Sequence, residues 1–533
     1  MDKRLECLAG LEQFQKIQRA AEESKTCAVF GVSEQKPYFT ALISELTKKK
    51  LFIVVPSEGD VVKTQAVMNR LAGKSLSFPT KDYNFRTVES VSRFDENRRI
   101  ETVAAIRKKE FSSIVIPAEA LCTLVMPPED YREMTIRPAD TVEFDKMADI
   151  LVSFGYERFN NVTGQGQFSI RGGIVDIFPP SEAQPYRIEF WDNDVDTVSL
   201  FDVNTQRRTE PVDGVRITPA KEYRAEIAEK LLEAITPFEG NEYADEDAEK
   251  LRGGILPKHD RWLPACYGKA ANILDYADKD TTVVFFEYNA CMEAVDGFAS
   301  RLKEDIKTLS EEGYPFLNAP YCFDEERIVS KLSSPIVFET LPRSLNDLKL
   351  DELAEIKLFP TAVSNTASLQ EDVLNYLDGK YKVFIVAANE EHAKELKKEF
   401  GNDENLDIST GDLPWGFICP EQKTAVFSFG QKKQLKKPPK SRFKRGEAIK
   451  NFSDINVGDY VVHVNYGIGV YDGIHKVESG GIINDYIRLK FAGTDVLYFP
   501  CSQLDQISKY TVGDSGVKVK LNKLGGNDWQ RTK

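Results

Sequence analysis

The sequence predicts a multidomain protein of α/β and β class, and three observations support this. A chain of 533 residues is too long for a single hydrophobic core. From about Thr26 to Ile116, short apolar runs alternate with helical stretches, which is typical of parallel strands covered by helices. Two later regions, 137–218 and 455–510, instead contain closely spaced strands separated by turn residues, which is typical of antiparallel β domains.

The first α/β unit is predicted to be split by an inserted domain. Its first part covers residues 1–120. After the β-rich region the mixture of helices and strands returns, and "DTTVVFFEYNACMEAVDGF" has the pattern of a strand followed by a helix. We therefore assign residues 216–340 to the second part of this α/β domain, and residues 121–215 to an inserted, mainly β domain.

Strand periodicity in the inserted domain predicts a polar face that carries binding residues. Successive side chains of a strand point to opposite faces, so in "YRIEFW" Ile188 and Phe190 face the core while Arg187 and Trp191 face outward. The same alternation in "QFSIR" places Arg171 on the outer face. Because Arg and Trp are enriched in binding hot spots, this face is predicted to dock a partner. The alternative is that Trp191 caps the core at the end of its strand.

A second, small α/β domain is predicted over residues 341–430, where "KVFIVAANEEHAKELKKEF" supplies a strand and a helix. Residues 431–453 follow as a linker rich in Lys, Arg and Pro. Pro438-Pro439 excludes a continuous helix there, and like charges repel, so a solvated linker is the favoured interpretation. A weak contact with DNA or RNA phosphates is the alternative.

The C-terminal β region, residues 454–518, is predicted to form a small barrel of five or six strands. In "GIHKVESGG" a short strand runs into paired glycines. Such an edge can accept a partner strand through unpaired backbone groups, although protection by its own lysines and by loops is an equal alternative on the pattern alone. Residues 519–533 form a polar tail.

Composition limits the function classes. The net charge of −14 argues against binding nucleic acid over the whole surface, because such binding needs clustered Lys and Arg. The eight cysteines contain no CxxC pair, which favours a reducing compartment. No segment approaches the ~20 apolar residues of a membrane span. We expect a cytoplasmic protein that is neither exported nor embedded in a membrane.

Enzymatic signatures are scarce. The four histidines are scattered and form no HxxxH pattern, so no metal site and no catalytic residue are predicted. The stretch "GVSEQKPYF" lies where a nucleotide-binding loop would lie, but a P-loop requires GxxxxGK[ST]. Only Gly31 fits this pattern. Lys36 stands at the second Gly position, Pro37 at the Lys position and Tyr38 at the Ser/Thr position.

Several long runs resemble one family. The segments "GYER" (155–158), "GQGQFSIRGGIVDIFPP" (164–180), "YRIEFWDNDVDTVSLFD" (186–202) and "NTQRR" (204–208) resemble the UvrA-binding module that the repair helicase UvrB shares with the bacterial transcription-repair coupling factors. Residues 455–510 are similar to the RNA-polymerase-interacting domain of the coupling factors, which UvrB lacks. The pair of modules identifies the chain as similar to the N-terminal half of a coupling factor.

The resemblance implies a fold and a set of site residues. The first domain would be a degenerate helicase-type α/β domain, and the C-terminal domain a small SH3/Tudor-like β-barrel. The loop with Gly31, Lys36, Pro37 and Tyr38 would be a degenerate P-loop. The UvrA contact would involve Arg171, Arg187, Phe190 and Trp191, with Phe190 as a support because its strand face turns inward. The contact with RNA polymerase would involve Lys476, Val477, Glu478 and Gly480.

The resemblance also implies partners and activity. The chain would be an adaptor that binds the β subunit of RNA polymerase and recruits UvrA for nucleotide excision repair. It would use no cofactor, because ATP and magnesium belong to motor domains that we expect to be absent from this chain. Residues 519–533 would be the start of the linker to those domains. Contact with DNA would come through those motor domains, or weakly through the basic linker. Two alternatives remain open: a UvrB-like ATPase that acts on damaged DNA, and a nucleic-acid-binding protein that uses the linker.

Overall fold

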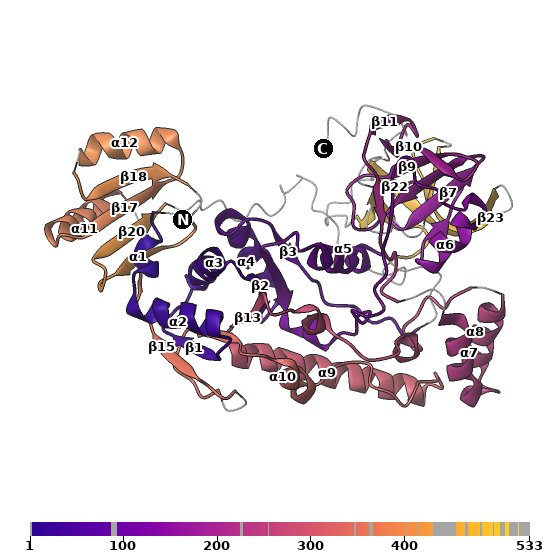
Figure 1. Cartoon of the computed structure of the whole chain (residues 1–533), viewed down its shortest axis with the longest axis horizontal. Helices are drawn as coiled ribbons and strands as arrows, with labels where there is room; N and C mark the ends of the chain where they lie inside the picture. The colour runs from indigo at the N-terminus through magenta and orange to yellow at the C-terminus, as the bar shows by residue number, and fades with distance from the viewer. Residues whose placement is uncertain are drawn as a thin grey trace.

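The protein contains several domains of α/β and β class, as the sequence predicts (Figure 1). The computed structural model describes residues 3–86, 93–223, 227–253, 255–345, 348–361, 366–401, 403–411, 413–429, 455–463, 467–479, 482–493, 495–500, 507–510 and 521.

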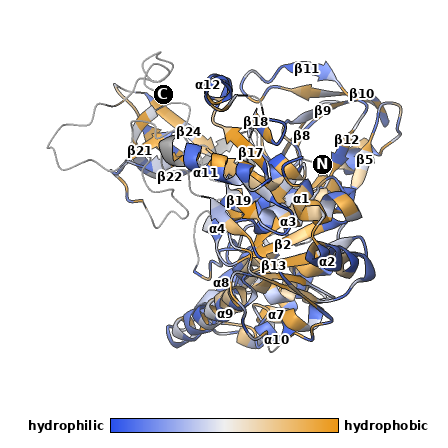
Figure 2. Cartoon of the chain, turned by 90° about the vertical axis from the view of Figure 1, so that its left-hand side faces the viewer, coloured by the Kyte–Doolittle hydropathy of each residue, from blue (hydrophilic) through white to orange (hydrophobic). Residues whose placement is uncertain are grey.

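The large α/β domain is built on a parallel sheet of seven strands in the order β15-β1-β14-β13-β2-β4-β3. The strands are β1 (Cys27–Phe30), β2 (Lys50–Val55), β3 (Ser75–Ser77), β4 (Ser113–Pro117), β13 (Thr281–Phe286), β14 (Ile336–Glu339) and β15 (Glu352–Glu355). Most strand residues are apolar and buried, because helices cover both faces of the sheet (Figure 2). Residues on both sides of the insertion thus contribute to one sheet.

Alternate residues of β2 belong to two hydrophobic cores. Leu51 and Ile53 pack with helices on one face, and Phe52 and Val54 pack with helices on the other. The first face carries α1 (Glu6–Ala9), α2 (Glu12–Glu23), α3 (Lys36–Thr47) and α4 (Glu58–Leu71); the second carries α5 (Phe94–Lys108), α9 (Tyr288–Glu311) and α10 (Glu325–Lys331). Short 3-10 helices at Ala118–Cys122, Leu263–Cys266 and Ile273–Tyr276 complete this domain.

The expected boundary at residue 340 is wrong. Strand β15 pairs in parallel with β1 and forms an edge of the large sheet, so residues 352–355 belong to the large domain and not to the small one. The pairing joins Cys27 with Glu352, and no local pattern in the sequence could reveal a partner so distant.

The inserted domain contains an open sheet in the order β11-β10-β9-β8-β7-β6. Its strands are β6 (Glu157–Arg158), β7 (Gln167–Arg171), β8 (Ile174–Phe178), β9 (Tyr186–Trp191), β10 (Asp194–Phe201) and β11 (Arg208–Pro211). All neighbours are antiparallel except β6 and β7. Helix α6 (Met147–Ser153), with the 3-10 turn Phe144–Lys146 before it, packs on the apolar face.

The base of the inserted domain lies later in the sequence than expected. Strands β5 (Met134–Ile136) and β12 (Val215–Ile217) pair with each other and close the domain. Residues 121–126, which the predicted range of 121–215 included, instead pack in the core of the large domain. This error arose because a buried apolar segment after β4 carries no signal for which domain it fills.

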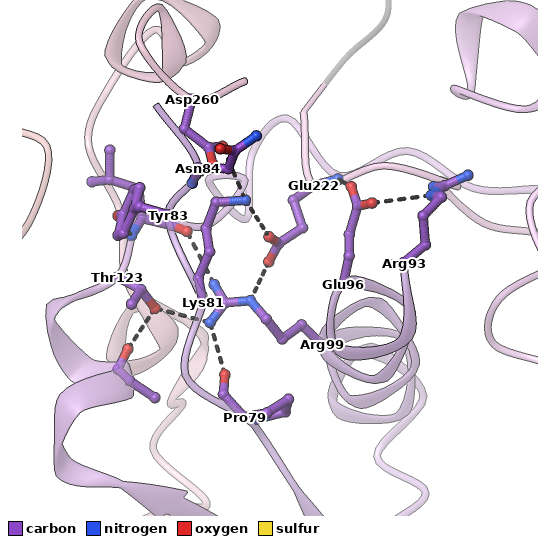
Figure 3. Close-up of polar contacts among 12 residues, drawn as sticks. Pro79, Lys81, Tyr83, Asn84, Arg93, Glu96, Arg99, Thr123, Glu222 and Asp260 are labelled. Atoms are coloured by element: carbon purple, nitrogen blue, oxygen red, sulfur yellow. Dashed lines mark hydrogen bonds and ion pairs between the residues drawn. The ribbon is translucent and has the colours of Figure 1, made fainter. Parts of the chain in front are cut away.

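Buried charges join the inserted domain to the large domain (Figure 3). Glu222, just after β12, accepts from Arg99 Nε of α5 at 2.6 Å, and Lys81 Nζ lies 3.6 Å from its other oxygen. Arg99 is 1% exposed and also donates to Pro79 O and Leu124 O. Arg93, at the start of α5, donates to Ala220 O. The chain therefore re-enters the large domain through a fixed set of polar contacts.

Two smaller units follow. Helices α7 (Ala228–Ile235) and α8 (Glu242–Arg252), with a 3-10 turn at Thr236–Phe238, pack around Trp262. The small α/β domain has a mixed sheet in the order β16-β19-β20-β17-β18. Its elements are β16 (Phe359–Thr361), α11 (Thr366–Asp378), β17 (Lys382–Ala387), α12 (Glu390–Phe400), β18 (Leu406–Thr410), β19 (Gly416–Cys419) and β20 (Thr424–Ser428).

The C-terminal domain is an antiparallel sheet in the order β24-β23-β22-β21-β25. Its strands are β21 (Tyr460–His463), β22 (Gly467–Ser479), β23 (Ile482–Lys490), β24 (Val496–Pro500) and β25 (Ile507–Lys509). They surround a core that contains Val461, Ile487, Leu489 and Phe499. In the described part of the chain no ladder joins β24 to β25, so the predicted barrel is observed as a five-stranded sheet.

Candidate interaction sites

The loop in the position of a nucleotide-binding loop, residues 31–38, runs from the end of β1 into the start of α3. Gly31 has φ +87° and follows β1 directly. A Cβ at this position would lie 2.2 Å from Ile356 O, so only glycine fits. Helix α3 begins at Lys36, with Pro37 in its first turn. The fold therefore retains the strand–loop–helix geometry of a nucleotide site at the carboxyl end of a parallel strand.

Lys36 is bound inside the protein. Its Nζ lies 2.7 Å from Glu287 Oε1 and donates to Thr340 Oγ1 at 2.8 Å and to Ser33 O at 3.3 Å. Glu287 and Thr340 follow β13 and β14, the strands next to each other in the middle of the sheet. The ammonium group thus neutralises a carboxylate of its own domain.

A second carboxyl group lies beside this ion pair. Glu339 ends β14 and is fully buried, and burial together with the neighbouring charge of Glu287 raises its pKa to about 7. Burial opposes the charged form of Glu287 as well, but Lys36 and Thr340 hold the pKa of Glu287 below its usual value. Below about pH 7 Glu339 therefore carries a proton, while Glu287 keeps its negative charge.

Tyr38 joins the loop to the small α/β domain. Its buried hydroxyl donates to Trp415 O at 2.7 Å and accepts from the N–H of Trp415 at 2.8 Å. Its ring lies 6.2 Å from the Trp415 ring and 6.1 Å from Phe417. Gln35 adds a hydrogen bond from Nε2 to Gly416 O at 3.2 Å. Segment 415–417 thus packs on the loop, beside α1 and α3 (Figure 1).

The residues of this loop do not fit a nucleotide phosphate. The proline at the lysine position cannot reach a phosphate and has no N–H to donate, the tyrosine at the hydroxyl position is fixed to Trp415, and Lys36 is paired with Glu287. The sequence showed that this loop does not match the P-loop pattern, but it could not show the contact of Tyr38 with Trp415, because Trp415 lies in another domain.

The polar face of the inserted domain is organised around Asp176, on the central strand β8. Asp176 is 1% exposed and accepts from Arg187 Nε at 2.6 Å and Nη2 at 2.9 Å. Arg171 Nη2 donates to the same carboxylate at 2.7 Å. The structure therefore brings the two predicted arginines together, through a residue that the sequence analysis did not single out. Strand alternation could have placed it on the outer face, since Asp176 stands between Val175 and Ile177, which face the core.

The two arginines differ in exposure. The Arg187 side chain is only 13% exposed and its guanidinium lies 5.1 Å from the Phe201 ring centre, so the prediction that Arg187 is exposed is wrong. The Arg171 side chain is 47% exposed, and its Nη1 donates to Asn161 Oδ1 at 2.7 Å. The strand faces were assigned correctly, but the neighbouring strands bury the middle of the outer face.

Trp191 and Phe190 lie as their strand faces predict. Trp191 is 82% exposed at the end of β9, which excludes the alternative that it caps the core. Phe190 is buried and packs edge-on against Phe144 at 5.2 Å. Beside them, Glu189 accepts from Thr197 Oγ1 and lies 3.5 Å from Arg208 Nη1. Trp191 and Arg171 are therefore the large, accessible side chains among the four predicted contacts.

The predicted polymerase contact lies in the β22–β23 hairpin. Lys476, Val477 and Glu478 pair with Asp485, Asn484 and Ile483 of β23. Their side chains are not among the described ones, and Gly480 lies outside the described residues. The expectation of a short strand is wrong, because β22 runs from Gly467 to Ser479. Only Gly467–Val470 pairs with β21, so among the described ladders the distal half of β22 is paired on one edge alone.

The remaining predictions concern the basic linker, metal sites and membrane-spanning helices. The basic linker at 431–453 lies outside the described residues. In the described part of the chain, no three His, Cys, Asp or Glu residues cluster as a metal site would require. None of the described helices combines the length and the apolar character needed to cross a bilayer.

Comparison with known proteins identifies two domains. Residues 134–223 match the UvrB interaction domain family, and residues 455–511 match the CarD-like/TRCF RID domain family. The first match begins at β5, in agreement with the base of the inserted domain.

Similar proteins cover most of the chain. The transcription-repair-coupling factor of Bacillus subtilis (strain 168) is 28% identical over 93% of this chain and 46% of its own length. Those of Staphylococcus haemolyticus (strain JCSC1435) and Staphylococcus aureus (strain MRSA252) are each 28% identical, over 89% and 86% of this chain and 44% and 42% of their own lengths. The chain spans about half the length of the curated relatives it matches. With both domains present and relatives aligned along most of its length, the chain is similar to the N-terminal half of the transcription-repair-coupling factors.

Proposed function

We propose that this chain is an adaptor in transcription-coupled nucleotide excision repair. It binds RNA polymerase through the C-terminal domain and UvrA through the inserted domain. The single observation that carries this proposal is the presence, in one chain, of a UvrB interaction domain and a CarD-like/TRCF RID domain. A protein with both modules can bring the repair machinery to a polymerase.

The UvrA contact is proposed on the outer face of the inserted domain. Trp191 offers a large apolar surface at the end of β9, and Arg171 offers a charged group with donors to spare. Arg187 and Phe190 support these residues from within the domain, because both side chains are largely buried. On β9, Trp191 is thus the contact residue and Arg187 and Phe190 are its supports, while the second contact residue, Arg171, lies on β7.

The polymerase contact is proposed at the distal half of β22, with the β subunit as partner. Addition of a partner strand satisfies backbone N–H and C=O groups along an open edge. The described ladders pair residues 474–479 with β23 on one edge only, which supports this mode. Val477 would contribute an apolar contact at its centre, with Lys476, Glu478 and Gly480 beside it.

The proposed adaptor does not bind ATP and is not an enzyme. Support comes from the loop that ends in Tyr38, where the contact with Trp415 and the Lys36–Glu287 ion pair take the place of phosphate contacts. The same geometry disfavours a UvrB-like ATPase.

A capture experiment tests the adaptor function. Immobilised chain is expected to retain purified UvrA and RNA polymerase together. The double variant Arg171→Ala, Trp191→Ala should weaken UvrA binding by about 2 kcal/mol or more and leave polymerase binding unchanged. Val477→Arg should remove polymerase alone, while Val62→Arg, on the exposed surface of α4, is the matched control that retains both. If the Arg171→Ala, Trp191→Ala variant and the Val477→Arg variant each retain both UvrA and polymerase, the assignment is refuted.

A further inference from the structure

One carboxylate holds two guanidinium groups on the outer face of the inserted domain. Asp176 lies on β8 between β7, which carries Arg171, and β9, which carries Arg187. Its oxygens accept three hydrogen bonds, at 2.6, 2.7 and 2.9 Å. With a side chain that is 1% exposed, Asp176 is too buried to meet a partner itself.

Asp176, Arg171 and Arg187 form a charged triad whose members differ in solvent exposure. Two arginines and one aspartate leave a net charge of one positive unit. Arg187 is 13% exposed and stacked on Phe201, whereas Arg171 is 47% exposed. The surplus positive charge is therefore presented to solvent at Arg171. A buried carboxylate that served stability alone would need only one arginine, and here it has a second, at the surface.

The contacts of Arg171 fix the plane of its guanidinium group. Nη2 donates to Asp176 and Nη1 donates to Asn161, so the group is held at two points. A guanidinium has five N–H donors in a rigid fork, and these two bonds use two of them. A group held in this way loses little further freedom when it binds, which favours affinity.

We propose that Asp176 is a positioning residue for the UvrA contact. Its buried carboxylate orients Arg171 so that the remaining N–H groups of Arg171 meet an acidic side chain of the partner, while Arg187 keeps the triad positively charged. This inference rests on the proposed UvrA-binding function and adds to it the mechanism of recognition and the acidic character of the group recognised.

A double-mutant cycle on the full chain tests the coupling. UvrA affinity is measured for the wild type, Asp176→Asn, Arg171→Ala and the double variant. Asp176→Asn should weaken binding about tenfold or more, although it touches no partner. In the Arg171→Ala background the same change should cost less than about twofold, because Arg171 is no longer there to be oriented. A purely structural role predicts the same loss of UvrA affinity in both backgrounds. That outcome would overturn the proposal.

Two further variants keep the test independent of folding. Asp176→Asn alone leaves Arg187 as a buried charge without a counter-charge. The double variant Asp176→Asn, Arg187→Gln removes both buried charges. Thermal unfolding should show that this double variant is folded, and it should still bind UvrA weakly. Glu182→Gln is the control, since Glu182 belongs to the same domain and pairs with Lys108 at 3.2 Å, towards the large domain. Its UvrA affinity should equal that of the wild type.

The outcomes separate the two claims. If the wild-type chain does not bind UvrA, the proposed function fails, and this inference fails with it. If the wild type binds and the folded Asp176→Asn and Asp176→Asn, Arg187→Gln variants bind equally well, the positioning role alone is wrong. The salt dependence gives a second criterion: Arg171→Ala, which removes the oriented charge, should make binding less sensitive to ionic strength than in the wild type.

Discussion

The hydroxyl of Tyr38 both donates to the carbonyl of Trp415, at 2.7 Å, and accepts from its N–H, at 2.8 Å. A side chain of the large domain thus satisfies both backbone groups of one residue in the small α/β domain. Because Tyr38 stands where a P-loop has its Ser or Thr, the position that would bind magnesium binds a neighbouring domain instead.

Tyr38→Phe should lower the free energy of unfolding by about 1–3 kcal/mol, because it leaves the two backbone groups of Trp415 without their partner. Denaturant unfolding measures this loss. Tyr376→Phe, within the small α/β domain, is the control and should have little effect. Equal stability of wild type and Tyr38→Phe would contradict the role assigned to the hydroxyl.

A titration with labelled ATP and magnesium should detect no saturable binding to the wild-type chain. The physical reason is that Pro37 and Tyr38 replace the lysine and hydroxyl that hold the terminal phosphate and the metal. Binding that saturates and depends on magnesium would show that the loop adopts a different geometry with nucleotide. An active P-loop ATPase under the same conditions is the positive control.

The pH dependence of stability should carry a contribution from Glu339. Its pKa is about 7 in the folded protein, against an ordinary 4.5, so the folded state keeps a proton that the unfolded chain releases. This stabilisation is complete below about pH 4.5 and is lost as the pH rises through about 7. Glu339→Gln, which cannot ionise, should therefore be more stable than the wild type at pH 8, by about 2–3 kcal/mol.

The difference between Glu339→Gln and the wild type should shrink as the pH falls from 8 towards 4.5, because below about pH 4.5 Glu339 is protonated in both the folded and the unfolded wild type. Denaturant unfolding at several pH values measures this. A difference that stays constant from pH 5 to pH 8 would show that the carboxyl group titrates normally.

Glu222→Gln should destabilise the junction between the inserted and large domains by about 3 kcal/mol or more, because it removes the counter-charge of buried Arg99. The exposed pair of Arg86 and Glu312, at 2.9 Å, provides the matched control: Glu312→Gln should change stability by less than about 1 kcal/mol. If both variants unfold at the same denaturant concentration as the wild type, the network in Figure 3 does not stabilise the junction.

Local patterns predicted what depends on neighbouring residues in the sequence. The period of two in β9 correctly placed Phe190 inside and Trp191 outside, because alternation is a property of a single strand. It misjudged Arg187, because burial of that residue depends on Asp176 and Phe201 in adjacent strands. The contact of Tyr38 with Trp415 and the pairing of β15 with β1 were beyond reach for the same reason, since each joins residues more than 300 positions apart.

The strand order of the large sheet also determines when the domain can fold during synthesis. In the described part of the chain, β1 pairs only with β14 and β15, so Cys27 has no strand partner until Ile336 has been made. At about 5–20 residues per second, the ribosome needs roughly 15–60 s for such a stretch. The inserted domain, whose β5–β12 ladder closes within residues 134–217, can complete its own sheet earlier. We therefore expect the apolar strand β1 to depend on chaperones, or on transient packing against α2 and α3, until the second half of its sheet emerges.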